Sequence, residues 1–151
     1  MIEKIREARP EIALSGDFNV GFPGETEADF EQTLKCVEEI GYASSFSFKY
    51  SVRPGTPGAS MPRQVPEDVK SERLKRLQDV LYRQQEAHNK SLIGRTLAVL
   101  VEGEGRQAGQ LFGRSPYLTG THFDGSTDLI GQIVEVKIEA AGRNSLIGGL
   151  V

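Results

Sequence analysis

Apolar positions at the start of the chain follow first helical and then strand spacing. Ile2, Ile5 and Ala8 share one face of a short helix that Pro10 ends. Residues 12–15 form a short apolar run, which is typical of a buried strand. The chain therefore begins with a predicted helix and a predicted strand.

A second helix is predicted after a loop at residues 16–24. Thr26 has the position of an N-cap, and Asp29, three residues later, completes a variant of the capping box. The apolar stripe of this helix consists of Phe30, Leu34, Val37 and Ile40. Cys36 lies beside the stripe, and we expect it to be a small packed residue. Residues 44–50 then alternate between polar and aromatic side chains, which predicts a strand.

The order strand, helix, strand predicts two parallel strands joined by a crossover helix. Two parallel strands do not form a stable sheet alone, so we expect further strands of an α/β domain to complete them. Residues 51–66 are rich in proline and glycine and predict a loop, and Pro66 suits the start of a long helix. The apolar stripe of that helix is narrow and consists of Leu74, Leu77 and Leu81. We therefore expect a largely solvated connecting helix.

The spacing of apolar residues changes again after Arg95. Five short strands are predicted at residues 96–102, 107–113, 120–124, 133–138 and 145–151. Glycine-rich turns separate them, which is typical of a small closed barrel of OB-like type. The sequence thus predicts an α/β part at residues 1–64, a connecting helix at 65–90 and an all-β barrel at 91–151.

Composition excludes several kinds of chemistry. The chain has 151 residues, a net charge of −3 and one cysteine. A single cysteine cannot form an internal disulfide or hold an iron–sulfur cluster by itself, and we predict no metal site. No apolar run is long enough to span a membrane and no signal peptide is evident, so we expect a cytoplasmic protein. Because no segment is strongly basic, RNA binding would depend on the local arrangement of cations.

Two loops follow predicted strands at the edge where parallel α/β folds bind ligands. The first contains Gly21 and Gly24, which would let a ligand approach the backbone, although the spacing alone favours an ordinary turn. In the second, Lys49 and Arg53 would either meet an anionic substrate such as a phosphate backbone or lie in a solvated loop. The residue pattern leaves these alternatives open.

The predicted barrel combines cations and aromatic residues, as small RNA-binding barrels do. Four arginines lie at or near its turns: Arg95, Arg106, Arg114 and Arg143. We expect Phe112 and Phe123 to be core residues and Tyr117 to be the better surface candidate. His122 is expected either to be structural or to touch RNA, and His88, at a helix end, is expected to face solvent.

Five short segments in a fixed order carry a family resemblance. They are residues 17–26, 46–57, 64–70, 113–115 and 129–131, followed by a further match at 144–146. Together they make the chain resemble the C-terminal portion of the MiaB-type tRNA methylthiotransferases, which are radical S-adenosylmethionine enzymes. The residues from about Leu92 resemble the RNA-binding TRAM domain. The segment that begins at Arg53 is similar to the tRNA-modifying branch, while Asn19 stands where an apolar residue is usual.

The resemblance implies an enzyme that inserts a methylthio group at carbon 2 of isopentenyladenosine, beside the tRNA anticodon. The enzyme would use S-adenosylmethionine and two 4Fe–4S clusters, whose cysteine ligands are absent from this chain, so this piece alone is expected to be inactive. The piece would supply the end of a radical S-adenosylmethionine barrel of TIM-like type and the RNA-binding barrel.

The resemblance also implies roles for particular residues. Gly21, Gly24 and Glu25 would lie near S-adenosylmethionine. The residues expected to face RNA are Lys49, Arg53, Arg95, Arg114, Tyr117 and Arg143. The expected partner is the anticodon stem-loop of tRNA, with no membrane or DNA, and the expected state is a monomer.

Two other functions stay open from the sequence. One is a stand-alone RNA-binding module formed by residues 91–151, and the other is a truncation product without function. Met1 is compatible with an internal methionine of a longer frame.

Overall fold

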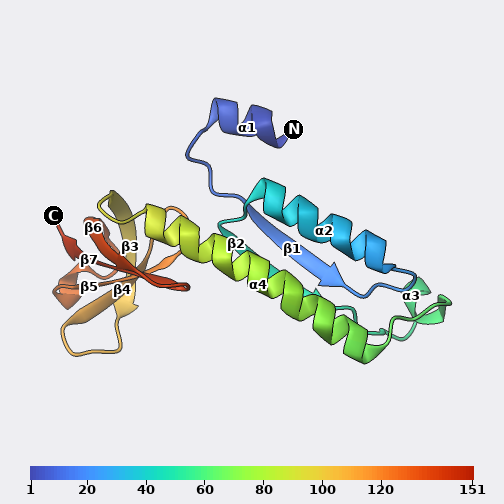
Figure 1. Cartoon of the computed structure of the whole chain (residues 1–151). Coiled ribbons are helices and arrows are strands. Elements are labelled where there is room, and N and C mark those ends of the chain that lie inside the picture. The colour runs from blue at the N-terminus through green and yellow to red at the C-terminus, as the bar shows by residue number, and fades with distance from the viewer. The chain divides into compact units, whose positions relative to one another are not determined.

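The chain divides into two units, and the boundary between them falls within one long helix (Figure 1). The computed structural model describes all residues from Met1 to Val151. The first unit comprises residues 1–84 and the second residues 85–151. The elements of the first unit are α1 (Ile2–Ala8), β1 (Ser15–Val20), α2 (Glu27–Ile40), β2 (Ser44–Lys49), α3 (Pro57–Ser60) and most of α4 (Glu67–Ser91). Those of the second are the end of α4, β3 (Thr96–Glu104), β4 (Gln110–Arg114), β5 (Gly120–Asp124), the 3-10 helix η1 (Thr127–Leu129), β6 (Ile133–Ala141) and β7 (Ser145–Leu150).

The first unit is built on a sheet of two parallel strands, β1 and β2. The parallel pairing and the crossover helix α2 confirm the predicted order of elements. The strand predicted at residues 12–15 is wrong, because β1 begins only at Ser15. The polar residues Asp17 and Asn19 made this segment resemble a loop. Both are exposed, so a strand tolerates them on the face of the sheet that is not buried.

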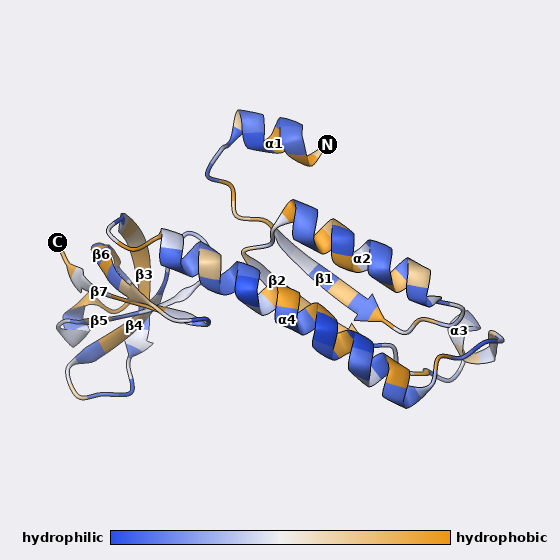
Figure 2. Cartoon of the chain, viewed as in Figure 1, coloured by the Kyte–Doolittle hydropathy of each residue, from blue (hydrophilic) through white to orange (hydrophobic).

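Helices α2 and α4 cover one face of this sheet, and Figure 2 shows an apolar stripe along each helix. The core of the unit consists of Val20, Phe30, Leu34, Val37, Leu77, Val80 and Leu81. On the opposite face, Phe46 and Phe48 of β2 are 70% and 56% exposed. The first unit therefore has an aromatic sheet face that none of its own helices covers.

The predicted capping box of α2 is confirmed. The Thr26 hydroxyl accepts a hydrogen bond from the Asp29 N–H at 3.2 Å, and the Asp29 carboxylate accepts one from the Thr26 N–H at 2.9 Å. Hydrogen bonds from Thr26 lower the pKa of Asp29. Cys36 is exposed, so the expectation of a packed cysteine is wrong. Its neighbour Val37 occupies the buried position at this turn of the helix.

Helix α4 begins where predicted, and its predicted apolar stripe lies against the core of the first unit, while many of its other side chains are exposed. Leu77 and Leu81 are buried in the core of the first unit. Lys70 and Arg73 lie in helical phase with these leucines and are also buried. No helix of the chain has the length and apolar character needed to cross a membrane.

The second unit contains a closed barrel of five strands in the order β3-β4-β5-β7-β6. Strands β5 and β7 pair in parallel, and the other neighbouring strands are antiparallel. The predicted five strands and closed barrel are confirmed, and the barrel is consistent with an OB-like fold. The buried core consists of Leu92, Leu97, Val99, Val101, Leu111, Phe123, Val136, Ile138 and Leu146. Strand β3 continues through a bulge after Val101 and so includes Gly103 and Glu104, which were predicted as a turn.

Candidate functional site

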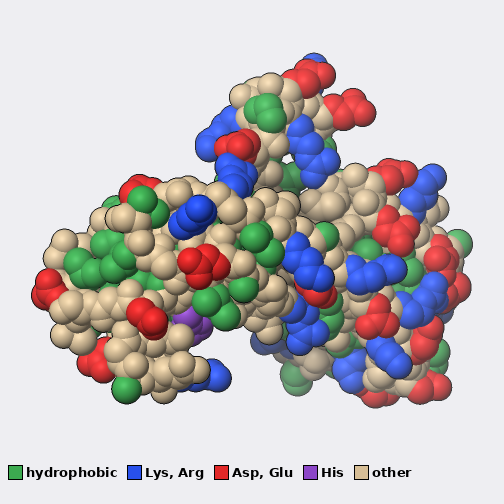
Figure 3. Space-filling model, turned by 60° about the vertical axis from the view of Figure 1, so that its left-hand side comes forward, with side chains coloured by type: hydrophobic (Ala, Val, Ile, Leu, Met, Phe, Trp, Pro, Cys, Tyr) green, Lys and Arg blue, Asp and Glu red, His purple; other side chains and the backbone are tan.

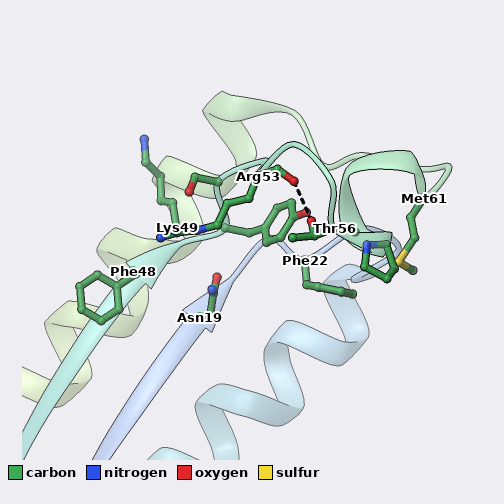
Figure 4. A pocket seen from close by; sticks show the side chains of 11 residues that line it. Asn19, Phe22, Phe48, Lys49, Arg53, Thr56 and Met61 are labelled. Carbon is green, nitrogen blue, oxygen red and sulfur yellow. Dashed lines mark hydrogen bonds between the residues drawn. The ribbon is translucent and has the colours of Figure 1, made fainter.

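A cavity of about 690 Å³ lies at the carboxyl ends of β1 and β2 (Figure 4). The position agrees with the sheet edge at which a ligand was predicted. The aromatic and apolar residues that line it are Phe22, Phe48, Tyr50, Pro57 and Met61. Polar groups come from Asn19, Lys49 and Arg53. Both the volume and the mixed lining suit a small organic ligand.

Tyr50 is held at this edge by its backbone and its ring. Its N–H donates to the Val20 carbonyl at 2.8 Å, and its ring meets Phe22 in a T-shaped contact with centroids 5.1 Å apart. A Cβ on Gly58 would lie 2.5 Å from the Tyr50 hydroxyl oxygen, so a larger residue would displace α3 or the ring. The hydroxyl is buried and has no hydrogen-bond partner. Buried polar groups normally have hydrogen-bond partners, so the unsatisfied Tyr50 hydroxyl is an unusual feature of the cavity wall.

The two predicted cations, Lys49 and Arg53, both line the cavity but differ in their contacts. The Lys49 ammonium pairs with Glu67 and donates to the Ser71 hydroxyl at 3.2 Å. The hydrogen bond from Lys49 is the main cause that lowers the pKa of Glu67. The Arg53 side chain is exposed, and its backbone carbonyl accepts a hydrogen bond from the Thr56 hydroxyl at 2.8 Å (Figure 4). Of the two, Lys49 is the one already engaged by a carboxylate of its own chain.

The loop between β1 and α2 contains the predicted ligand residues Gly21 and Gly24. Gly21 has φ +79°, and a Cβ there would lie 2.1 Å from the Lys70 side chain. Gly24 has φ +91°, and its N–H donates to the Arg63 carbonyl at 2.9 Å. Glycine is therefore required at both positions by the backbone conformation, and at Gly21 also by packing against Lys70. Their contact with S-adenosylmethionine stays a prediction.

Glu25, the third predicted ligand residue, ties this loop to α4. Its carboxylate accepts the Gly21 N–H at 3.0 Å and pairs with Arg73 at 2.7 Å. The two paired side chains are only 15% and 6% exposed. The guanidinium also lies 5.6 Å from the centre of the Phe30 ring. Sequence reasoning missed Arg73, and the available signal was its helical phase with the buried leucines of α4.

Arg114 lies at the end of β4 on the outside of the barrel. Its Nε donates to the Glu102 carboxylate at 3.2 Å, and its Nη1 donates to the Leu118 carbonyl at 3.3 Å. The guanidinium carbon lies 5.6 Å from the centre of the Phe112 ring. Because the side chain is 47% exposed, a bound phosphate could reach it while these contacts hold its position.

Phe112 and Tyr117 of the barrel do not lie where the sequence predicted them. Phe123 is a core residue, as predicted. Phe112 is half-buried and lies outside the core, because Leu111 beside it faces inward and side chains alternate along a strand. Tyr117 packs against the core and meets His88 with ring centroids 5.3 Å apart. The surface position predicted for Tyr117 and the solvent-facing position predicted for His88 are therefore wrong.

The backbone carbonyls of Arg95 and Arg143 both accept hydrogen bonds near the end of α4. The Arg95 carbonyl, just before β3, accepts the Ile138 N–H at 2.8 Å. The Arg143 carbonyl, in the turn between β6 and β7, accepts a hydrogen bond from the side chain of Asn89 at 2.8 Å. Asn89 is buried, and its hydrogen bond joins this turn to the helix. The roles of these arginines in RNA binding stay predictions.

Partial burial of His88 predicts a pH dependence of barrel stability. Desolvation, with a smaller contribution from the charge of Arg95, lowers its pKa below the ordinary value of 6.5. As the pH falls through 6.5, the unfolded chain therefore takes up a proton that the folded chain still excludes, and stability falls. The fall ends once the folded form is protonated too.

Thermal unfolding of the chain between about pH 7.5 and pH 5.5 measures this effect. We expect His88→Phe to show a shallower decline of the unfolding midpoint over that range than the unsubstituted chain. Equal slopes for both proteins would show that His88 does not titrate differently in the folded and unfolded states.

The side chains of the chain do not form a metal site. No group of three or more His, Cys, Asp or Glu side chains is placed to hold a metal ion. A 4Fe–4S cluster is held by several cysteine thiolates, whereas Cys36 is the one cysteine of this chain. The residues present do not fit an iron–sulfur cluster.

Comparison with known proteins identifies similar sequences for the barrel and for almost the whole chain. Residues 90–151 match the TRAM domain. A protein from Maricaulis maris named tRNA-2-methylthio-N(6)-dimethylallyladenosine synthase is 63% identical over 150 residues, which is 99% of this chain and 33% of that protein. Proteins of the same name from Agrobacterium fabrum and Erythrobacter litoralis are 60% and 56% identical, over 97% and 100% of this chain and 32% and 34% of their own lengths.

These similarities confirm the predicted resemblance to the tRNA methylthiotransferases. The chain spans about a third of the length of the curated relatives that it matches.

Proposed function

We propose that this chain is the tRNA-binding, C-terminal part of an enzyme that methylthiolates carbon 2 of N6-isopentenyladenosine beside the anticodon. The observation that carries the proposal is the similarity of nearly the whole chain to synthases named for this modification, together with a TRAM domain at residues 90–151. In this proposal the chain alone is inactive, and its two units serve binding and positioning.

The first unit would complete a larger α/β barrel of the radical S-adenosylmethionine type. Two parallel strands with a crossover helix are the repeating unit of such barrels. Helices cover one face of the sheet, while Phe46, Phe48, Asp17 and Asn19 lie on the other. In a closed barrel this second face would point to the interior. The interior position would also account for the polar residue Asn19, which lines the cavity.

S-adenosylmethionine bound with a 4Fe–4S cluster would supply the radical chemistry, and cysteines outside this chain would hold the clusters. This chain would contribute a wall of the cofactor and substrate site. Gly21, Gly24 and Glu25 would shape the loop that carries Phe22 into the cavity, since their immediate neighbours are side chains of α4 and Arg63. Arg53 would meet a negatively charged group at the cavity rim.

A stand-alone RNA-binding module is a second candidate. The closed barrel with its own core favours it, because such a unit does not need the first unit to bury its apolar residues. Both candidates share RNA binding by the barrel, and only the first predicts a contribution to methylthiolation.

Replacing Arg114 with alanine tests RNA binding by the barrel. Fluorescence anisotropy would follow binding of the complete chain to a labelled tRNA anticodon stem-loop at several salt concentrations. We expect Arg114→Ala to weaken binding several-fold and to reduce the salt dependence by about one phosphate contact. Arg9→Ala, which removes an exposed cation outside the barrel, is the matched control and should change neither quantity. Unchanged affinity of Arg114→Ala at every salt concentration would refute the assignment of Arg114.

A further inference from the structure

Three side chains form a row across the outside of the barrel. In the strand register, Phe112 of β4 lies directly opposite His122 of β5, and His122 lies beside Ile147 of β7. The rings of Phe112 and His122 are tilted, with centroids 5.2 Å apart, and Ile147 is 50% exposed. The row is therefore a partly exposed aromatic and apolar surface on three adjacent strands.

A hollow of about 490 Å³ lies over this row. Besides the three residues of the row, it is lined by Glu104, Gly105, Arg106, Gln107, Gln110 and Ser145. The amide and hydroxyl groups can donate and accept hydrogen bonds at the edge of a flat ligand. The hollow thus combines a ring surface with polar groups around it.

A glycine helps to shape this surface. A Cβ on Gly120 would lie 2.8 Å from the Phe112 ring, so a side chain at this position would push the ring away from β5. Gly120 faces Arg114 across the β4–β5 pair. With glycine there, the ring of Phe112 can lie over the strand, and Arg114 stands beside it with its guanidinium 5.6 Å from the ring centre.

His122 contributes a polar ring atom without a partner to the residues that line the hollow. Its Nδ1 is buried and has no hydrogen-bond partner in the chain. Buried polar atoms without a partner are uncommon in folded proteins. No internal hydrogen bond at Nδ1 fixes the orientation of this ring, which borders the hollow.

We propose that this surface binds one unpaired nucleobase of an RNA, stacked on Phe112 and His122, with a neighbouring phosphate at Arg114. The inference rests on the proposed RNA-binding function of the barrel and identifies the part of the RNA that is bound. A base offers a flat face for the rings and polar edges for Gln110 and Ser145. The faces of bases inside a duplex are already stacked, so the site selects unpaired nucleotides.

The test uses the complete 151-residue chain and an RNA hairpin with 2-aminopurine at unpaired loop positions, compared with a blunt duplex of equal length. We expect tighter binding of the hairpin and a change in 2-aminopurine fluorescence on binding. Phe112→Leu keeps an apolar side chain but removes the flat ring, and we expect it to weaken hairpin binding about tenfold. We expect no effect of this substitution on the salt dependence or on duplex binding. Phe112→Tyr should retain both the affinity and the fluorescence change.

Two further variants separate stacking from charge and from general surface effects. Arg114→Ala should change the salt dependence, in contrast to Phe112→Leu. Ile133→Ala removes a 70% exposed apolar side chain elsewhere on the barrel and should have no effect. Circular dichroism of each variant checks that the barrel is folded.

The outcomes distinguish this inference from the function on which it rests. Hairpin binding that depends on Arg114 but is unaffected by Phe112→Leu would overturn the stacking site and leave RNA binding standing. Equal affinity for hairpin and duplex would also overturn it. Failure of the unsubstituted chain to bind either RNA would overturn the proposed RNA-binding function itself.

Discussion

Replacing Arg73 with methionine is expected to lower the free energy of unfolding of the first unit by about 3 kcal/mol. The Arg73 side chain is 6% exposed and pairs with Glu25, which is 15% exposed, at 2.7 Å. Methionine fills much of the same volume but leaves the Glu25 carboxylate with little water and without its cation. Removal of one partner from such a pair costs far more than the intact pair contributes.

Urea unfolding followed by circular dichroism at the helix signal measures this loss. Arg83→Met is the matched control, because Arg83 lies on the same helix and is exposed. We expect the control to change stability by less than about 0.5 kcal/mol. A double-mutant cycle with Glu25→Gln should give a coupling energy of about 1–3 kcal/mol. Equal losses for the two arginine variants, with no coupling to Glu25, would show that the pair does not hold the loop.

Local patterns in the sequence were sufficient for most of the elements. The capping box at Thr26, the alternation in residues 44–50 and the glycine-separated strands after Arg95 each depend on neighbouring residues, and all three predictions are confirmed. The predicted position of strand β1 was wrong because the polar residues of this strand lie on the exposed face of the sheet. Which face of a strand is covered depends on distant elements, and local alternation does not contain that information.

The candidate sites were harder to predict for the same reason. The edge of the sheet and Lys49 and Arg53 could be identified from chain order, since strand ends and loops follow directly from the elements. The burial of Arg73 depends on contact between α4 and the glycine loop, which are far apart in sequence. Phe112 was misplaced because strand phase decides which side chains point inward, and the register of β4 was not known. Tyr117 was misplaced because it lies in the turn after β4, and its packing against the barrel core depends on residues distant in sequence.

A hybrid enzyme that contains this chain is expected to form the 2-methylthio product. The hybrid would join the first two thirds of the Maricaulis maris relative, which this chain does not match, to the complete chain. The 63% identity over the matching third is the reason for choosing this relative for the hybrid. In the hybrid, the open sheet face with Phe46 and Phe48 would line the interior of the completed α/β barrel, and the second unit would hold the tRNA.

The matched control is the same hybrid without residues 85–151, which removes the barrel and leaves the first unit. We expect it to lose at least about tenfold in product, because each base or phosphate contact that the barrel would make in this proposal is worth about 1 kcal/mol or more. Activity equal to that of the complete hybrid would show that the barrel is not needed for tRNA binding.

The most direct test is mass spectrometry of nucleosides from the tRNA of a host that makes isopentenyladenosine but lacks its own methylthiotransferase. With the complete hybrid, we predict conversion of isopentenyladenosine to its 2-methylthio derivative. If the hybrid is folded and carries its iron–sulfur clusters but only isopentenyladenosine is found, the result contradicts the proposal that this chain is part of a tRNA methylthiotransferase.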